Sequence, residues 1–305
     1  MKELGTHRSL VDAIVATDEG WLSAGRDGTI RRWPDGQVIH RCIEGDFVTS
    51  FAGRFAGTLH SQVLHRGNEG FSPVFEAMEE GIGDLASAPD GGVFVCGDDN
   101  RVEHRRADGS IVWVAETYKF PYALDVDDDT LFIATWDAYL YPVDLAVPPK
   151  GTANEPTELP YPEHPPAPMP LYDVVSLGNG RVAVASHGER GETTLHGWSV
   201  GETKPLWEAS LDPIYALDFH SGRDLIAAGG DAGVVHFRSA DGSAHGSETL
   251  PEVRGEVSDA WFPAVAEFDE LGTANAVTAV AFDAKGESVL VGTSSGVLIR
   301  VPVPD

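Results

Sequence analysis

One pattern of apolar and polar positions recurs along the whole chain. Each copy has a short alternating segment, a polar turn, an apolar segment ending in small residues, and a second polar turn. Alternation with a period of two predicts β-strands, because successive strand side chains point to opposite faces. The spacing of the copies, about 35 to 65 residues, lies within reach of known repeat periods. The predicted first strands begin at Val11, Val48, Ile82, Pro121, Leu171, Ile214 and Val277.

Each copy continues in two further segments joined by a short glycine turn. Asp35-Gly36 separates Arg31–Trp33 from Gln37–His40, and Asp108-Gly109 occupies a similar place in the third copy. Asp-Gly favours tight hairpins, because glycine adopts a positive φ without a Cβ clash. Four strands per copy predict an all-β fold, a seven-bladed β-propeller of four-stranded antiparallel blades in one domain, residues 1–305. The second copy, Val48–Ala77, is short and degenerate, so six or eight blades stay open.

The first copy carries the most specific motif. Its segment LSAGRDGTIRRW, Leu22–Trp33, resembles the signature of the WD-repeat (WD40-like) β-propeller family, and His7 stands where that family has an upstream histidine. The resemblance implies a buried, hydrogen-bonded structural tetrad formed by His7, Ser23, Asp27 and Trp33. The other copies keep the hydrophobic frame without the tryptophan, with Arg105 and Arg238 at the matching places.

The two ends of the chain predict how the last blade is completed. The last copy ends in Val297–Asp305, which supplies only a third strand. The segment Lys2–His7 precedes the first copy and has no other predicted partner. We therefore expect it to form the outer strand of the last blade, closing the ring and removing an exposed sheet edge.

Two segments depart from the repeat. Residues 147–170 contain nine prolines and predict an extended connector between the fourth and fifth copies, or alternatively a peptide-like ligand for another domain. Residues 251–274 predict a short helix capped by Asp259, which packs on the ring or, if exposed, forms a docking patch. The apolar side of that helix would carry Trp261, Phe262, Val265, Phe268 and Leu271.

Charge narrows the classes of partner. The chain has 48 acidic and 21 basic residues, a formal net charge of -27. Nucleic acids and anionic membranes need a basic surface, so neither is an expected partner. The charge indicates either solubility in a salty environment or attraction of a basic partner. With no signal peptide or long apolar segment, and only Cys42 and Cys96, a cytoplasmic location is expected.

Motifs for catalysis and for metal binding do not appear. The eleven histidines show no zinc-ligand spacing, and neither a nucleophile elbow nor a phosphate-binding loop is present. The acidic stretch Asp125–Thr130 lacks the glycine and glutamate of a calcium loop and predicts a turn. We therefore expect no catalytic residue, metal or cofactor. The alternative is a hydrolase or lyase that uses Asp84, Asp173 and a histidine at the channel mouth.

One sector of the predicted ring is rich in aromatic residues. Tyr122, Tyr172 and Tyr215 occupy the same position in three successive copies, the second residue of the first strand. The turns after the second strands open on the same face, where Trp136 and His187 fall in this sector. Because tyrosine and tryptophan anchor interfaces, these five residues predict a top-face binding site for a protein or peptide with basic residues. The alternative is that the rings only cap the channel. The turn positions read Arg26, His60, Asp98, Trp136, His187, Gly230 and Ser294.

Overall fold

The computed structural model describes residues 1–68, 70–78, 81–160, 170–187, 193–252 and 276–304. These residues form β-strands, turns and loops, with no helix among them, and the strands assemble into seven sheets. The chain divides into two compact units, which we describe separately. Unit one comprises Met1–Val48, Asp212–Ser239 and Ser243–Asp305, and unit two comprises Thr49–Leu211 and Ala240–Gly242.

All seven first strands begin at the predicted residue. Each begins with a buried residue, and the strict alternation expected of a strand is interrupted within Ile82–Ser87 and Leu171–Gly178. The count of seven sheets decides against six or eight blades, and the degenerate second copy forms a full sheet. The first strands are β2 (Val11–Thr17), β6 (Val48–Ala52), β10 (Ile82–Ser87), β14 (Pro121–Asp127), β18 (Leu171–Gly178), β22 (Ile214–His220) and β26 (Val277–Phe282).

Unit one contains three four-stranded antiparallel sheets. The first adds β3 (Gly20–Gly25), β4 (Thr29–Trp33) and β5 (Gln37–Arg41) to β2. The second adds β23 (Leu225–Gly230), β24 (Val234–Ser239) and β25 (Ala244–Thr249) to β22. The third adds β27 (Ser288–Thr293), β28 (Val297–Pro302) and β1 (Lys2–Thr6) to β26.

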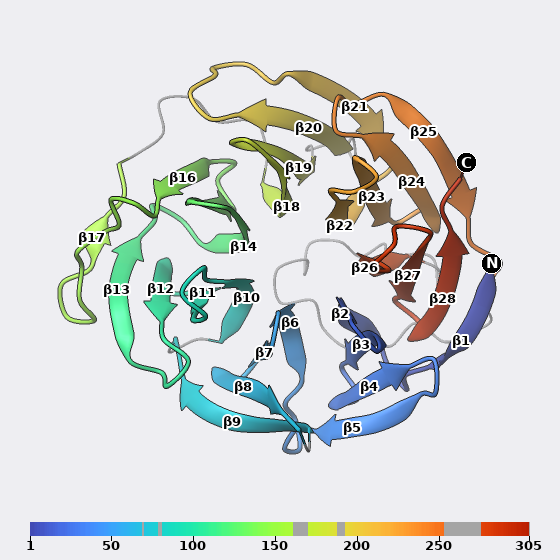
Figure 1. Cartoon of the computed structure of the whole chain (residues 1–305), viewed down its shortest axis with the longest axis horizontal. Coiled ribbons are helices and arrows are strands. Elements are labelled where there is room, and N and C mark those ends of the chain that lie inside the picture. The colour runs from blue at the N-terminus through green and yellow to red at the C-terminus, as the bar shows by residue number, and fades with distance from the viewer. Residues whose placement is uncertain (69, 79–80, 161–169, 188–192, 253–275, 305) are drawn as a thin grey trace. The chain divides into compact units, whose positions relative to one another are not determined.

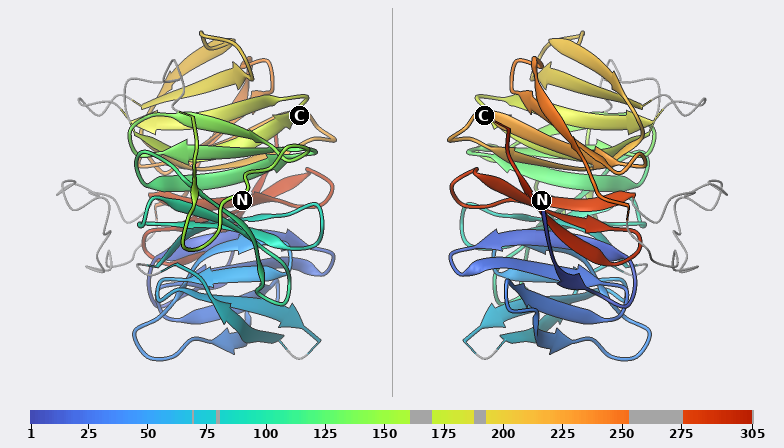
Figure 2. Two further views of the ribbon diagram at one scale, coloured as in Figure 1. Left: turned by 90° about the vertical axis from the view of Figure 1, so that its left-hand side faces the viewer. Right: turned by 90° about the vertical axis from the view of Figure 1, so that its right-hand side faces the viewer.

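The prediction for the chain ends is confirmed, because β1 is the outer strand of the last sheet. It pairs antiparallel with β28, from Lys2 opposite Arg300 to Thr6 opposite Val297. The amide of His7 then donates to the carbonyl of Gly296 at 2.8 Å. Figure 1 shows the blue N-terminal strand beside the red β28, and Figure 2 shows the same pair from the side. The edge of β28 is thereby covered.

Unit two contains four sheets. Strand β6 is followed by β7 (Phe55–Thr58), β8 (Gln62–Gly67) and β9 (Gly70–Glu76). Strand β10 is followed by β11 (Val93–Gly97), β12 (Arg101–Arg105) and β13 (Ile111–Glu116), and β14 by β15 (Thr130–Thr135) and β16 (Leu140–Asp144). Strand β18 is followed by β19 (Arg181–His187), β20 (Thr193–Ser199) and β21 (Trp207–Leu211).

The fourth sheet has three strands within the described residues, where the repeat predicts four. The proline-rich segment instead supplies β17 (Thr157–Glu158), which pairs in parallel with β13 of the preceding sheet. Pro156 and Pro160 flank β17 and lack amide donors, so they limit it to two residues. Pro142 is exposed in β16, where a missing amide weakens any further pairing. Residues 161–169 and the helix expected around Asp259 lie outside the described residues.

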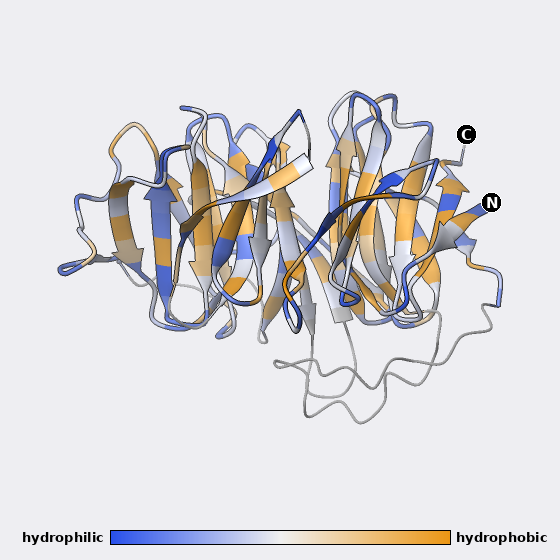
Figure 3. Cartoon of the chain, turned by 90° about the horizontal axis from the view of Figure 1, so that it is seen from below, coloured by the Kyte–Doolittle hydropathy of each residue, from blue (hydrophilic) through white to orange (hydrophobic). Residues whose placement is uncertain are grey.

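The core lies between adjacent sheets within each unit. Apolar residues follow the strands and polar residues gather in the turns, as Figure 3 shows by colour. In unit one, Phe237 of β24 packs on Phe282 of β26 with ring centroids 6.4 Å apart. The second strands β11, β23 and β27 are buried along their whole length. Because both faces of these strands are covered, their sequences are almost entirely apolar.

Candidate functional site

An irregularity occurs at the second residue of the first strands β2, β10, β14, β18, β22 and β26, where the pairing with the second strand skips that residue. A bulge of this kind bends a strand and changes the direction of a side chain. The sequence pattern did not predict it. The residues at the bulges are Asp12, Gly83, Tyr122, Tyr172, Tyr215 and Thr278.

The turn after the second strand lies beside this bulge in blades one, four and six, where the blades are numbered in the order of their first strands. In blade four the amide of Trp136 donates to the carbonyl of Phe120 at 2.9 Å, immediately before the first strand. The amides of Arg26 and Asp231 make the equivalent hydrogen bonds in blades one and six, also at 2.9 Å. The turn residue of blade six is therefore Asp231, and the expected Gly230 was wrong by one position.

Bulge and turn residues interact within a blade. In blade one Arg26 Nε donates to Asp12 Oδ1 at 3.0 Å, and both side chains are nearly buried. In blade six Tyr215 donates a hydrogen bond to the carboxylate of Asp231, whose pKa burial nevertheless raises. The predicted site residue Tyr215 thus has a carboxylate partner within unit one.

In unit two, Tyr122, Trp136 and Tyr172 form one aromatic cluster. The Tyr122 ring centroid lies 5.7 Å from that of Trp136 and 5.8 Å from that of Tyr172. Trp136 and Tyr172 are 6.3 Å apart, and the Tyr172 ring stands at 74° and 75° to its two neighbours. All three residues are half-buried, so part of each remains accessible to a ligand. Edge-to-face packing of this kind is favourable and holds the rings in place.

Burial changes the ionisation of the two tyrosines. It raises the pKa of Tyr172 to about 12. Burial, together with Tyr172 and the carboxylate of Asp98, raises the pKa of Tyr122 well above its ordinary value. Both hydroxyls therefore stay protonated to a higher pH than an exposed tyrosine and can donate hydrogen bonds.

Blade three places the Asp98 carboxylate next to this cluster. The residue at the bulge of this blade is a glycine, Gly83, which has no side chain. Asp98 is exposed in the turn after β11, and the bulge residue Gly83 is also exposed. A Cβ at Gly83 would meet no atom closer than 3.7 Å. The aromatic cluster therefore has an accessible negative charge on its blade-three side.

The last residue of the predicted sector is His187. It ends β19, where it pairs with Thr193, and the structure describes only its backbone. Three of the five predicted residues are thus brought into one cluster, while Tyr215 lies in unit one. The sequence reasoning missed Tyr118 and Phe120, which are exposed in the connection before β14. The signal that the sequence offered for them is the presence of two aromatic residues in a short loop.

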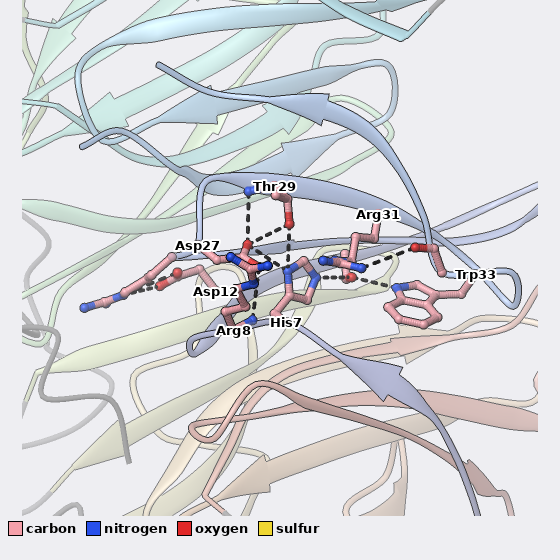
Figure 4. Close-up of polar contacts among 10 residues, drawn as sticks. His7, Arg8, Asp12, Asp27, Thr29, Arg31 and Trp33 are labelled. Carbon is pink, nitrogen blue, oxygen red and sulfur yellow. Dashed lines mark hydrogen bonds and ion pairs between the residues drawn. The ribbon is translucent and has the colours of Figure 1, made fainter. Parts of the chain in front are cut away.

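The four residues of the expected tetrad lie in one hydrogen-bonded chain. Figure 4 labels His7, Asp27 and Trp33 of this chain. His7 Nδ1 lies 3.0 Å from Asp27 Oδ1, and His7 Nε2 lies 2.7 Å from Ser23 Oγ. Trp33 Nε1 donates to the same Ser23 hydroxyl at 2.7 Å. The network continues at Thr29, whose hydroxyl donates to Asp27 Oδ1 at 2.6 Å. These buried contacts join β3, β4 and the segment after β1.

In blade three, Arg105 stands in place of the tetrad tryptophan. Its Nε donates to Glu103 at 2.6 Å, and its guanidinium lies over the ring of Phe75, 5.3 Å from the centroid. An ion pair with an aromatic neighbour therefore replaces the tryptophan hydrogen bond in this blade.

The two carboxylates of the alternative enzyme hypothesis have structural contacts. Asp84 Oδ2 accepts the amide of Leu124 in the next blade at 2.7 Å. Asp84 Oδ1 accepts the amide of Leu85 at 2.8 Å and the hydroxyl of Ser50. Asp173 Oδ1 accepts the amide of Val174 at 2.8 Å. Because both oxygens of Asp84 are occupied, this residue has the surroundings of a structural group.

The Asp84 contact has counterparts in both units. Asp125 accepts the amide of Ser176, and Asp218 accepts the amide of Phe282 at 2.7 Å. Each amide belongs to the innermost strand of the next blade, where one strand edge has no sheet partner. An aspartate of the preceding blade thus satisfies a donor that would otherwise be unpaired.

Two kinds of feature are absent from the described residues. No group of three His, Cys, Asp or Glu side chains there is arranged to hold a metal ion. No helix in that part of the chain is long and apolar enough to cross a membrane.

The buried carboxylates predict how stability depends on pH. Burial raises the pKa of Asp12 to about 7, and the pKa values of Asp84 and Asp125 to about 6. The folded state therefore holds these protons more tightly than the unfolded state, and their ionisation destabilises it as pH rises from about 4 to about 7. We expect the free energy of unfolding to fall by several kcal/mol over this interval, because each unit of pKa difference corresponds to about 1.4 kcal/mol. Urea denaturation at several pH values measures it.

Asp84→Asn is the matched variant, because a neutral amide removes the Asp84 share of this pH dependence and leaves the shares of Asp12 and Asp125. Asp27 has the opposite effect on stability, and it acts at the lower end of this pH interval. Burial alone would raise its pKa, but hydrogen bonds from His7, Thr29 and the Arg8 amide hold it well below its ordinary value. Its stabilisation is lost only in strong acid. Constant stability between pH 4 and 7 in the unmodified protein would contradict the prediction.

Comparison with known proteins identifies the fold. The chain is similar to the WD40 β-propeller domain of Doa1, with a TM-score of 0.75 and 16% sequence identity, over 98% of this chain and 94% of that one. No protein-family model matches the sequence, and no curated protein matches it. The predicted fold class is confirmed. The chain has the fold of a seven-bladed WD40 β-propeller, whose last blade is completed by the N-terminal strand.

Proposed function

We propose that this chain is a non-enzymatic interaction module that binds a segment of a partner protein at the cluster of Tyr122, Trp136 and Tyr172. The observation that carries the proposal is the position of the three rings. They come from bulges and a turn at the same end of blades four and five, in mutual contact and half-exposed. Aromatic residues held in this way lose little conformational entropy on binding and bury a large area. His187 remains a predicted contact next to this cluster, and Tyr215 remains a predicted contact within unit one.

The charge of the chain favours a partner segment with arginine or lysine. The net charge is -27, and the Asp98 carboxylate acts on Tyr122 itself. A cation beside this carboxylate can also lie over an aromatic ring, which contributes about 0.5–2 kcal/mol. The long-range field of the acidic surface speeds the encounter. Nucleic acid and anionic membranes are not the partners that we propose, because the same field repels them.

Two supporting proposals concern the setting of the protein. Residues 1–305 act as one propeller domain, since a single propeller covers 98% of the chain. The protein works in the cytoplasm, where its two free cysteines, half-buried Cys42 and buried Cys96, would stay reduced.

Selection of random peptides displayed on phage, with the immobilised full chain as bait, tests the proposal. We expect enriched peptides to contain arginine or lysine. Tyr172→Ala and Trp136→Ala should each weaken binding of an enriched peptide by about 2 kcal/mol, roughly 30-fold in Kd, because each removes a partly buried anchor. Isothermal titration calorimetry gives the affinity, and thermal melting reports the folded state.

Two control variants separate binding from folding. Tyr172→Phe keeps the ring and should bind within a few-fold of the unmodified protein. Leu206→Ala alters an exposed apolar residue before β21, away from the cluster, and should have no effect. The proposal fails if no peptide is enriched, or if both alanine variants in the cluster bind as the unmodified chain does.

A further inference from the structure

The connection between β13 and β14 lies directly beside the aromatic cluster. It contains Tyr118 and Phe120, whose exposed fractions are 64% and 40%. The carbonyl of Phe120 accepts the amide of Trp136 at 2.9 Å, so this loop and the cluster are linked through one backbone hydrogen bond. Two large exposed apolar side chains within three residues are typical of a contact surface.

Hydrogen bonds at its start fix the conformation of the loop. The amide and hydroxyl of Thr117 both donate to the carbonyl of Asn100, at 2.9 and 3.1 Å. The same hydroxyl approaches the carbonyl of Lys119 at 2.7 Å, and the amide of Tyr118 donates to the Tyr141 hydroxyl at 3.5 Å. A loop held in this way displays its aromatic rings without a large ordering cost when a partner binds.

Charged groups of both signs surround the loop, and they indicate the chemistry of the partner. Asn100 follows Asp98 and Asp99, so the turn that anchors the loop carries two carboxylates. The ammonium group of Lys119 lies over the Tyr118 ring, 5.7 Å from its centroid. This contact shows that the Tyr118 ring can accommodate a cation, and it occupies one face of that ring. Phe120 has no such contact among those that the structure describes.

On the basis of the proposed function, we propose that Phe120, supported by Tyr118, is the outer anchor of the same binding surface. It takes an apolar side chain of the partner, while the basic residue of that partner binds at Asp98 and the cluster. The occupant is therefore an extended segment of a partner protein with a basic residue and an aliphatic or aromatic residue a few positions apart. The carboxylates supply negative charge that complements the basic residue of the partner. The apolar anchor supplies the area that its apolar residue buries.

A double-mutant cycle with an enriched peptide tests this contact. Phe120→Ala in the protein should weaken the parent peptide about tenfold. The same variant should bind a peptide with its apolar residue changed to alanine about as well as the unmodified protein does, because the contact is already lost. Melting should be unchanged, since Phe120 is exposed. Val112→Ala, at an exposed residue of β13, is the matched control and should leave both affinities unchanged.

The outcomes separate this inference from the proposed function. If Phe120→Ala binds the parent peptide normally while Tyr172→Ala weakens it, the outer anchor is wrong and the cluster stands. If Phe120→Ala weakens both peptides equally, the ring does not contact the apolar residue and the inference is again overturned. If Phe120→Ala, Tyr172→Ala and Trp136→Ala all leave binding unchanged, both proposals fall.

Discussion

Trp33→Ala is expected to lower the free energy of unfolding by about 3–5 kcal/mol, the usual cost of emptying a buried aromatic position. The Trp33 side chain is buried, and its Nε1 donates to Ser23 at the end of the tetrad. Its ring also fills the space over two glycines: a Cβ at Gly5 would lie 2.8 Å from it, and one at Gly36 3.2 Å. Loss of the indole would therefore leave a cavity between β4 and β1 and an unpaired end to the hydrogen-bonded chain.

Denaturant unfolding followed by circular dichroism measures this loss. Trp33→Phe is the control, because it keeps much of the buried area and removes the hydrogen bond, at a cost of about 1–2 kcal/mol. Trp21→Phe tests a second tryptophan of the same blade that has no tetrad contact among the described hydrogen bonds. If Trp33→Ala cost no more than Trp33→Phe, the indole would not be a packing element of this blade.

Deletion of residues 1–5 is expected to have the second large effect on stability. It removes four of the five residues of β1, exposes the edge of β28, and uncovers the Trp33 ring. We expect a lower melting temperature by several degrees or more, together with self-association, because an unpaired strand edge is a template for other chains. Differential scanning calorimetry and light scattering measure the two consequences.

Lys2→Ala is the matched control for this deletion, since it changes an exposed side chain of β1 and keeps every backbone pair. It should melt like the unmodified chain and stay monodisperse to the same extent. Unchanged melting and monodispersity of the truncated protein would mean that β1 contributes little to the last blade.

The first strands were predictable because their signal is local. An apolar residue begins each one, alternation follows, and a turn ends it, so all seven starting positions could be read from the chain. The bulges were not predictable in this way. They depend on how one strand pairs with another, and the sequence of Pro121–Asp127 looks like an ordinary strand. The error at Gly230 has the same origin, because bulge and turn were aligned without the pairing.

The contacts between blades were missed although a signal existed. Tyr122–Asp125 and Tyr215–Asp218 share the sequence Tyr-Ala-Leu-Asp, and both aspartates accept an amide of the next blade. A repeated aspartate in an apolar strand is costly unless it has a partner, so it should have been predicted as a structural acceptor. The route of Thr157–Glu158 to β13 could not be predicted, because long loops carry no periodic signal.

The pairing of β1 with β28 has a consequence for the order of events in the cell. Residues 2–6 are synthesised long before their partners in Val297–Arg300. Strand β1 must therefore wait, unpaired, until β28 has been made. Contacts so far apart in sequence are slow to form, since the chain must close a long loop. We expect the remaining blades to form before this one, which gives chaperones a defined segment to shield until β28 has been made.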